Sequence, residues 1–135
     1  MKPEEHKKAL QEHIGNISDA VDKGIQENQR NIAFNVSQGS VELFSLFLHS
    51  LHLIEGSGDQ LDHRVFKNKD LIQKKLPLEF PSKNKILDLM KEIELERTAL
   101  CYGSRKPNER IENVLSKFHE LRKIIKKELK NYKIS

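Results

Sequence analysis

Arg97 is a charged residue inside an otherwise apolar helical pattern. The apolar residues Ile86, Met90, Ile93 and Leu100 recur at spacings of four, three and seven, and Arg97 falls on the same predicted helix face. A guanidinium stays charged at physiological pH, and burying a charge without a partner is costly. We therefore expect Arg97 to have a partner or a function, and we predict it as a site residue.

A second unusual pattern lies on an earlier long helical stretch. Six polar residues recur there at spacings of three or four and form a continuous seam: Asn35, Gln38, Glu42, Ser45, His49 and His52. One interpretation is a solvent-facing strip, as on any surface helix. The other is a groove facing the Arg97 helix or a second subunit, where Glu42 could pair with Arg97. His49 and His52 could then act as acid or base, because imidazoles titrate near neutral pH.

The same seam has some features of a metal site. His49 and His52 lie three residues apart, which suits two imidazoles on one ion, with Glu42 two turns earlier. Carboxylate metal sites of helical bundles instead use Glu-x-x-His pairs, and the corresponding position after Glu42 holds Ser45. The sequence also has no His-Glu-x-x-His, no glycine-rich phosphate loop, no Gly-x-Ser-x-Gly and no second cysteine. We therefore expect neither a metal nor an organic cofactor.

The other histidines carry less weight. His6, His13 and His119 fall on polar helix surfaces, and His63, which follows a glycine-rich break, is given no role beyond a possible groove contact.

Positive charge is concentrated near the end of the chain. The whole sequence has a net charge of +4, whereas residues 117–135 hold seven basic and two acidic residues.

Such a basic helix could follow the phosphates of RNA or an anionic surface, or it could be a solvated helix face. If RNA binds, we expect contacts from Lys123 and Lys127 on this helix, and from Arg105 and Lys106 in the turn before it.

The sequence predicts a first helix and a long second one. Apolar residues of the first helix repeat at spacings of four, three and four before a glycine that would stop it: Leu10, Ile14, Ile17, Val21 and Gly24. The second helix should extend from about residue 27 to residue 54. Gly39 and Ser40 in its middle lower helix propensity, and close approach by a neighbouring helix would explain them.

Further helices follow a break at residues 55–59. A short helix is expected over residues 68–76. Ser82 is the predicted N-cap of the Arg97 helix, which should end near Gly103, and the last helix should begin around Pro107.

No stretch keeps the period of two that a strand requires, so the predicted fold class is all-α. We expect an antiparallel bundle of four main helices plus one short helix, in one domain over residues 1–135. The single cysteine, Cys101, fits a small core position and a reducing cytoplasm, and the polar start shows no secretory signal. The apolar run at residues 41–54 is too short and too polar to span a membrane. We therefore expect a cytoplasmic protein that does not bind membranes.

Six residues at the end of the predicted Arg97 helix resemble the motif of HEPN domains: Arg97-Thr98-Ala99-Leu100-Cys101-Tyr102. HEPN domains are helical bundles of prokaryotic toxin–antitoxin and nucleotidyltransferase-associated systems, with an Arg-x4–6-His motif near the end of a late helix. The helix order agrees over most of the chain. Tyr102 stands where the family has histidine.

The resemblance implies a dimer in which the motif arginine and histidine meet across the interface and cleave RNA without metal. Arg97 matches the arginine, but a phenol with a pKa of about 10 is a poor base at neutral pH. We therefore favour a non-catalytic HEPN-like module, a homodimer that binds RNA or a nucleotidyltransferase-type partner, with Glu42 and Tyr102 in the binding site. Two alternatives stay open: a metal-independent ribonuclease using Arg97 with His49 or His52, and a homodimeric scaffold in which Arg97 only satisfies Glu42.

Overall fold

The computed structural model describes residues 2–54 and 61–134. Its elements, in chain order, are α1 (Pro3–Lys23), α2 (Gln29–Ser50), the 3₁₀ helix η1 (His63–Lys67), α3 (Lys69–Lys75), α4 (Lys83–Tyr102) and α5 (Asn108–Ile134). No β-strand occurs within the described ranges, which confirms the predicted all-α class. None of the helices in these ranges combines the length and apolar character that a membrane span needs.

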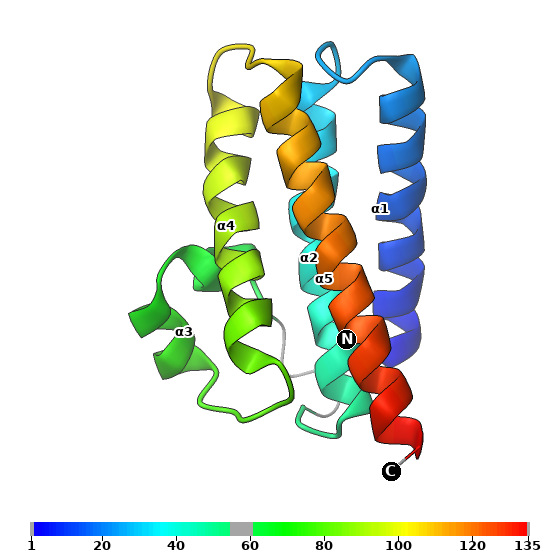
Figure 1. Cartoon of the computed structure of the whole chain (residues 1–135), viewed down its shortest axis with the longest axis vertical. Helices are drawn as coiled ribbons and strands as arrows, with labels where there is room; N and C mark the ends of the chain where they lie inside the picture. Colours follow the sequence, from blue (N-terminus) through cyan, green and yellow to red (C-terminus); the bar gives the residue numbers. More distant parts are fainter. Residues whose placement is uncertain (1, 55–60, 135) are drawn as a thin grey trace.

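The four long helices form an up-down-up-down bundle (Figure 1). α1 and α4 run in one direction and α2 and α5 in the other, so consecutive long helices are antiparallel. α2 is central, because it packs against α1, α4 and α5. The short elements η1 and α3 lie beside α4, near the end of the bundle where α2 finishes. The predicted bundle of four main helices and one short helix is therefore confirmed.

The ends of α1 and α2 follow from local backbone conformation. α1 stops at Gly24, whose φ of +133° is one that other residues rarely adopt. α2 begins at Gln29 and ends at Ser50, four residues before the predicted end at residue 54. His52 has a φ of +59° and lies in the turn after α2. A left-handed residue cannot continue a right-handed helix, so the prediction of helix at residues 51–54 was wrong.

The core fills the space between α2 and the elements around it. Its largest fully buried apolar side chains come from α2, η1, α4 and α5: Ile32, Phe44, Phe47, Leu48, Phe66, Ile86, Ile93, Leu100, Ile111, Leu121 and Ile125. The apolar stripe predicted on α4 is buried throughout, and Arg97 is buried within it.

Gly39 lies where α2 approaches its neighbours. A Cβ atom at this position would lie 3.3 Å from Cζ of Phe118 on α5 and 3.4 Å from Cβ of His13 on α1. The separation from Phe118 is tighter than an ordinary van der Waals contact, so a side chain here would press on that ring. The predicted close approach at Gly39 is thus confirmed.

α4 begins where it was predicted to begin, but its first turn is capped differently. Ser82 occupies the N-cap position with a φ of +58°, and its side chain makes no hydrogen bond to the start of the helix. Its hydroxyl instead donates to Oε1 of Glu128 on α5 at 3.0 Å. The predicted N-cap position of Ser82 is therefore correct, but the expected hydrogen bond from its side chain to the first turn is not formed. α4 ends at Tyr102, next to Gly103, as predicted.

Candidate functional site

Arg97 is buried at the contact between α4 and α2, with 7% of its surface exposed. Its Nη1 donates a hydrogen bond to Oγ of Ser37 at 3.1 Å, and its guanidinium carbon lies 5.1 Å from the ring centre of Phe34. Its Nε has no hydrogen-bond partner within residues 2–54 and 61–134, and no carboxylate there pairs with it. A hydroxyl and an aromatic face therefore offset this permanent charge, without a counter-ion.

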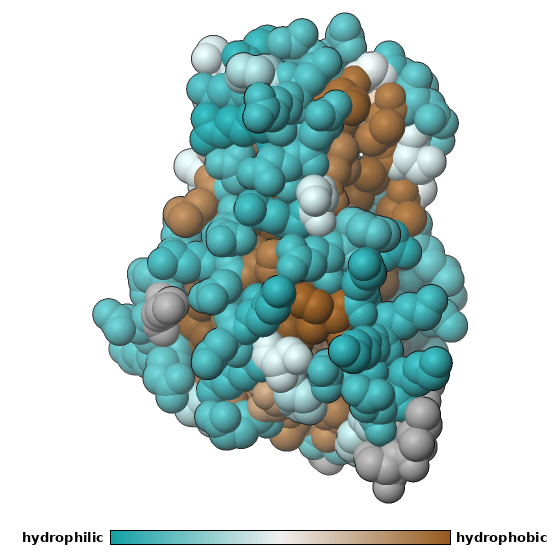
Figure 2. Space-filling view, in the orientation of Figure 1, coloured by the Kyte–Doolittle hydropathy of each residue, from teal (hydrophilic) through white to brown (hydrophobic). Residues whose placement is uncertain are grey.

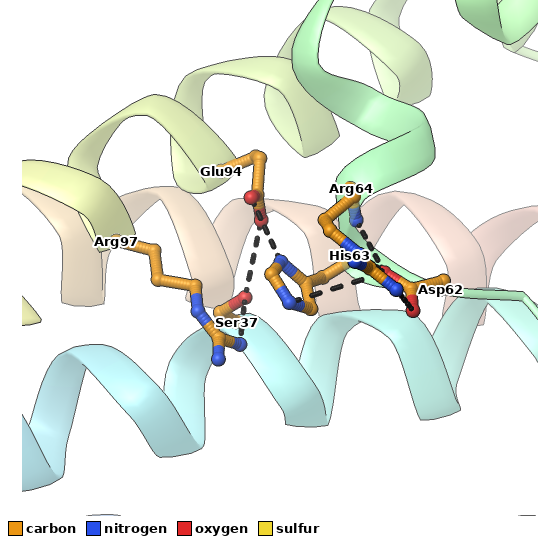
Figure 3. Close-up of polar contacts among 6 residues, drawn as sticks. All are labelled: Ser37, Asp62, His63, Arg64, Glu94 and Arg97. Atoms are coloured by element: carbon orange, nitrogen blue, oxygen red, sulfur yellow. Dashed lines mark hydrogen bonds and ion pairs between the residues drawn. The ribbon is translucent and has the colours of Figure 1, made fainter.

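Glu94, one turn before Arg97 on α4, is also buried, with 3% of its surface exposed. Its Oε1 lies 2.8 Å from Nδ1 of His63 on η1. Its Oε2 lies 3.5 Å from Oγ of Ser37, which donates to it and accepts from Arg97. The four side chains thus form a continuous polar chain across α2, α4 and η1 (Figure 3).

The contact with Glu94 fixes the orientation of the His63 ring. A carboxylate at Nδ1 keeps a proton on that nitrogen and leaves Nε2 of the neutral ring as a proton acceptor. Nε2 lies 3.9 Å from Oδ1 of Asp62, which is too far for a hydrogen bond. The His63 side chain is 22% exposed, so Nε2 is available to a ligand in the way that a general base requires.

These groups line a surface hollow of about 390 Å³ beside α4 and η1. Its lining comes from η1, from the residue before it and from the second half of α4: Asp62, His63, Arg64, Lys67, Glu94, Arg97, Thr98 and Tyr102. Tyr102 is 75% exposed and therefore presents its ring to solvent at this hollow. The hollow combines a carboxylate–imidazole pair, cations and an accessible aromatic ring.

Two charges of the hollow neutralise one another. Nε and Nη2 of Arg64 bond to the two carboxylate oxygens of Asp62 at 3.0 and 2.9 Å, and the Arg64 backbone N–H adds a third bond at 2.8 Å. These hydrogen bonds hold the pKa of Asp62 well below its usual range, so its carboxylate is ionised. Arg97 and Lys67 form no ion pair within the described residues. Even with His63 neutral, these two cations outnumber the remaining carboxylate of Glu94, and the unmatched charge is positive.

Glu42 does not reach this hollow. Its Oε2 lies 2.5 Å from Nδ1 of His6 on α1, so the predicted Glu42–Arg97 pair is wrong within the chain. Helix geometry explains the error. Ser37, which does contact Arg97, lies five residues before Glu42, and five residues turn a helix by about 140° beyond a full rotation. The two side chains therefore leave α2 on different faces.

His49 and His52 are also remote from Arg97 in the chain. His49 is buried against α1, with its ring centre 5.3 Å from that of His6. It follows Ser37 by twelve residues, which is about 18 Å along the helix axis. His52 is exposed in the turn after α2. The groove predicted between these imidazoles and the Arg97 helix is therefore not formed within the chain.

The polar seam of α2 packs against α1 instead. Oδ1 of Asn35 lies 2.8 Å from Nδ1 of His13 and accepts a hydrogen bond from Asn16 at 3.2 Å. His6, predicted on a polar surface, is 3% exposed. Asn35, Ser45 and His49 are buried, so neither the solvent strip nor the groove facing α4 describes this face. Side chains on the inner face of α1 contact Asn35, Glu42 and His49, which sequence spacing on α2 alone could not indicate.

Of the other predicted binding residues, Tyr102 alone lines the hollow. Nη1 of Arg105 donates to the backbone carbonyl of Gln26, and the backbone N–H of Lys106 donates to Oε1 of Gln29 at 2.6 Å. These bonds attach the α4–α5 loop to the region where α2 begins. Lys123 and Lys127 are exposed on α5, which contributes no residue to the hollow.

Sequence reasoning missed Glu94 and gave His63 too small a role. Glu94 lies three residues before Arg97, so the spacing alone places the two on one side of α4 and could have indicated it. His63 is separated from Glu94 by 31 residues, and its place depends on how η1 packs against α4.

Cys101 is partly buried, and its Sγ lies 3.8 Å from the backbone carbonyl oxygen of Arg30. Burial raises the pKa of its thiol, and the nearby positive charge of Arg97 only partly opposes the shift. Cys101 is therefore no activated nucleophile.

Across the described ranges, no group of three or more His, Cys, Asp or Glu side chains is arranged to hold a metal ion.

Comparison of the chain with protein-family models, with curated proteins and with solved structures found no match. The residues of the hollow are thus the basis on which a function can be proposed.

Proposed function

We propose that the hollow beside Arg97 binds a phosphate of single-stranded RNA and that the protein is a HEPN-like RNA-binding module. The observation that supports this proposal is the buried guanidinium of Arg97, which lines an open hollow and has no carboxylate partner among the described residues. A guanidinium presents planar N–H donors that match phosphate oxygens. A bound phosphate would supply the counter-charge that no described residue gives Arg97.

Two aromatic rings favour RNA over a free anion. Tyr102 is 75% exposed at the hollow, and Phe34, under the guanidinium of Arg97, is 44% exposed. Unpaired bases of RNA stack on such accessible rings, whereas a free anion gains nothing from them. Lys67 lines the same hollow, and in this proposal its ammonium would contact a second phosphate of the strand.

Fluorescence anisotropy with a labelled single-stranded RNA of about 12 nucleotides tests the proposal, because strands of that length cover sites of this size. We expect Arg97→Met to weaken binding at least about tenfold and to reduce the salt slope by about 0.7 for one lost phosphate contact. Arg110→Met is the matched control, since Arg110 pairs with Glu96 on the surface away from the hollow. Equal RNA affinity of Arg97→Met and wild type would overturn the proposal.

A second candidate function, a metal-independent endoribonuclease, is favoured by one observation: Glu94 bonds Nδ1 of His63 and leaves Nε2 accessible. In this reaction Nε2 would take the proton of a ribose 2′-hydroxyl. The 2′-oxygen would then bond to the adjacent phosphorus while the bond to the 5′-oxygen breaks and water protonates the leaving oxygen. The products are a 2′,3′-cyclic phosphate and a 5′-hydroxyl. Here His63 replaces His49 and His52 as the base.

Incubation of RNA with the protein in EDTA, followed by analysis of the product ends, tests this candidate. We expect cyclic phosphate ends with wild type and their loss in His63→Asn. His119→Asn, on the exposed surface of α5, should keep full activity. Intact RNA, or cleavage that persists in His63→Asn, would remove the nuclease candidate and leave the binding proposal in place.

The homodimer implied by the family resemblance and the nucleotidyltransferase-type partner stay predictions. Leu95 and Tyr102 support a dimer surface next to the hollow, because both are exposed and lie seven residues apart on one face of α4. Sedimentation equilibrium should then show dimers with wild type and a shift toward monomer with Leu95→Ser. A monomer at all concentrations would exclude the dimer.

A further inference from the structure

A groove lined by residues of α1 and α5 lies between these two helices, which Figure 1 shows on one face of the bundle. Both helices pack on α2, but no described Cα atom of α1 lies within 8 Å of one of α5. The resulting groove has a volume of about 660 Å³ and continues into a smaller hollow of about 240 Å³, with Ile14, His119 and Arg122 lining both. A band of apolar surface lies between α5 and α1 at the upper right of Figure 2.

The floor of this α1–α5 groove is apolar. Its apolar lining is contributed by all three helices: Leu10, Ile14 and Ile17 of α1, Leu43 of α2, and Leu115, Phe118, Ile125 and Leu129 of α5. Five of them, Leu10, Ile14, Leu43, Leu115 and Leu129, are only partly buried. Further apolar area is therefore available for burial against another molecule.

The charged side chains that line the groove are all cationic. Arg122, Lys123, Lys126 and Lys130 form its α5 side, and neither the groove nor the adjoining hollow has an acidic residue in its lining. All four are exposed, and none forms an ion pair within the described part of the chain. The rim thus carries an unbalanced positive charge beside an apolar floor.

We infer that the α1–α5 groove docks an acidic amphipathic helix of a partner protein. The lining of α5 extends from Leu115 to Lys130, which corresponds to about 22 Å or four helical turns. A helix laid along the groove would place an apolar stripe on the floor and carboxylates against the rim. Charge and polarity select this occupant. A second copy docked symmetrically would bring two basic rims together, and a nucleic acid would leave the apolar floor uncovered.

The experiment uses the full chain and a fluorescein-labelled helical peptide of about 18 residues, long enough to fill the groove. The peptide carries leucines at positions i, i+3, i+4 and i+7 with glutamates flanking them, and a control peptide carries lysine in place of every glutamate. We expect saturable binding of the acidic peptide alone. Methyl NMR should show shifts at Leu10, Ile14 and Leu43, and none at Leu95, which lies on α4 outside the groove.

Two matched pairs of variants test the rim and the floor. Lys123→Glu/Lys126→Glu should weaken peptide binding about tenfold, because attractive charges become repulsive. Lys23→Glu/Lys127→Glu makes the same change in net charge at exposed positions outside the groove lining and should stay within about twofold. Leu10→Gln should weaken binding, and Leu95→Gln should not. Thermal denaturation of each variant checks that it is folded.

Each other result overturns the inference and names a different occupant or none. Binding of both peptides alike, or of neither, excludes an acidic helix. Dimerisation lost in Leu10→Gln assigns the groove to a second copy, and binding to phosphatidylserine vesicles without peptide binding assigns it to an anionic membrane. Arg97→Met should leave peptide binding unchanged, so this inference and the proposed RNA site can fail separately.

Discussion

The Nδ1 atom of His63 lies 2.8 Å from Oε1 of Glu94, although 31 residues separate them in the sequence. This contact attaches η1 to the middle of α4. It also gives a buried carboxylate a hydrogen-bond partner, without which burial would be costly. The same contact orients the imidazole so that Nε2 is left for a ligand in the hollow.

The His63–Glu94 contact should be energetically coupled. His63→Ala leaves the buried carboxylate of Glu94 without its main partner, and we expect a loss of about 1–3 kcal/mol in the free energy of unfolding. Glu94→Leu alone removes the carboxylate as well. The double variant should lose less than the sum of the two, with a coupling energy of at least about 1 kcal/mol. Urea denaturation of the four proteins measures this, and additive losses would show that the contact contributes nothing.

Arg97→Met should separate function from stability. Methionine has a similar length and removes a buried charge that has no counter-ion among the described residues, so we expect the free energy of unfolding to stay the same or rise by about 1–2 kcal/mol. RNA should raise the melting temperature of wild type more than that of Arg97→Met, because the variant binds RNA more weakly. A loss of more than about 2 kcal/mol would instead mark Arg97 as a structural residue.

Substitutions at Gly39 and Gly15 should change the free energy of unfolding in opposite directions. At Gly39 a Cβ would already press on Phe118, so Gly39→Leu should lower the free energy of unfolding by about 2–3 kcal/mol. At Gly15, in the middle of α1, a Cβ would meet nothing within 4 Å. Gly15→Ala should therefore raise stability by about 0.5–1 kcal/mol through helix propensity. Thermal denaturation of both variants provides the comparison.

Glu42→Gln should affect stability and leave RNA affinity unchanged. Glu42 contacts buried His6 on α1, so the neutral amide weakens a charge-assisted contact, and we expect a loss of about 1 kcal/mol. Glu12→Gln, on the exposed surface of α1, is the matched control. A clear change in the RNA affinity of Glu42→Gln, measured by anisotropy, would contradict this expectation and show that Glu42 contributes to RNA binding.

Cys101 should react slowly at neutral pH. Burial raises the pKa of its thiol above the usual value of about 8.5, so the thiolate fraction rises only at higher pH. The rate of iodoacetamide alkylation should therefore reach half its maximum at a higher pH in the folded protein than in urea. The folded state holds the thiol proton more tightly than the unfolded state does. The stability that this proton contributes is therefore complete below the pKa of the thiol in the unfolded state, and it is lost as pH rises through the pKa of the thiol in the folded state. The stability of Cys101→Ser should lack this dependence.

Apolar spacing was sufficient to predict the α-helices and the place of Arg97 on the apolar face of α4. The stripe of α4 and the stop at Gly24 depend on positions within a few residues of each other, and helical periodicity relates such positions directly. The small residue at Gly39 correctly indicated a close approach, because only a neighbouring backbone or ring makes the absence of a side chain useful there. The turn after Ser50 was missed, since the apolar pattern continues beyond the point where the backbone of His52 turns left-handed.

The partners of the polar side chains were decided by tertiary structure. Spacing on α2 grouped Glu42 with His49, but it could not tell which neighbouring helix the group would face, and α1 covers it rather than α4. Arg97 was identified from its sequence position alone. Its contacts with Ser37 and Phe34, and the contact between His63 and Glu94, join segments that are distant in the sequence. Periodicity fixes which residues share a helix face, and the packing of one helix against another fixes what that face meets.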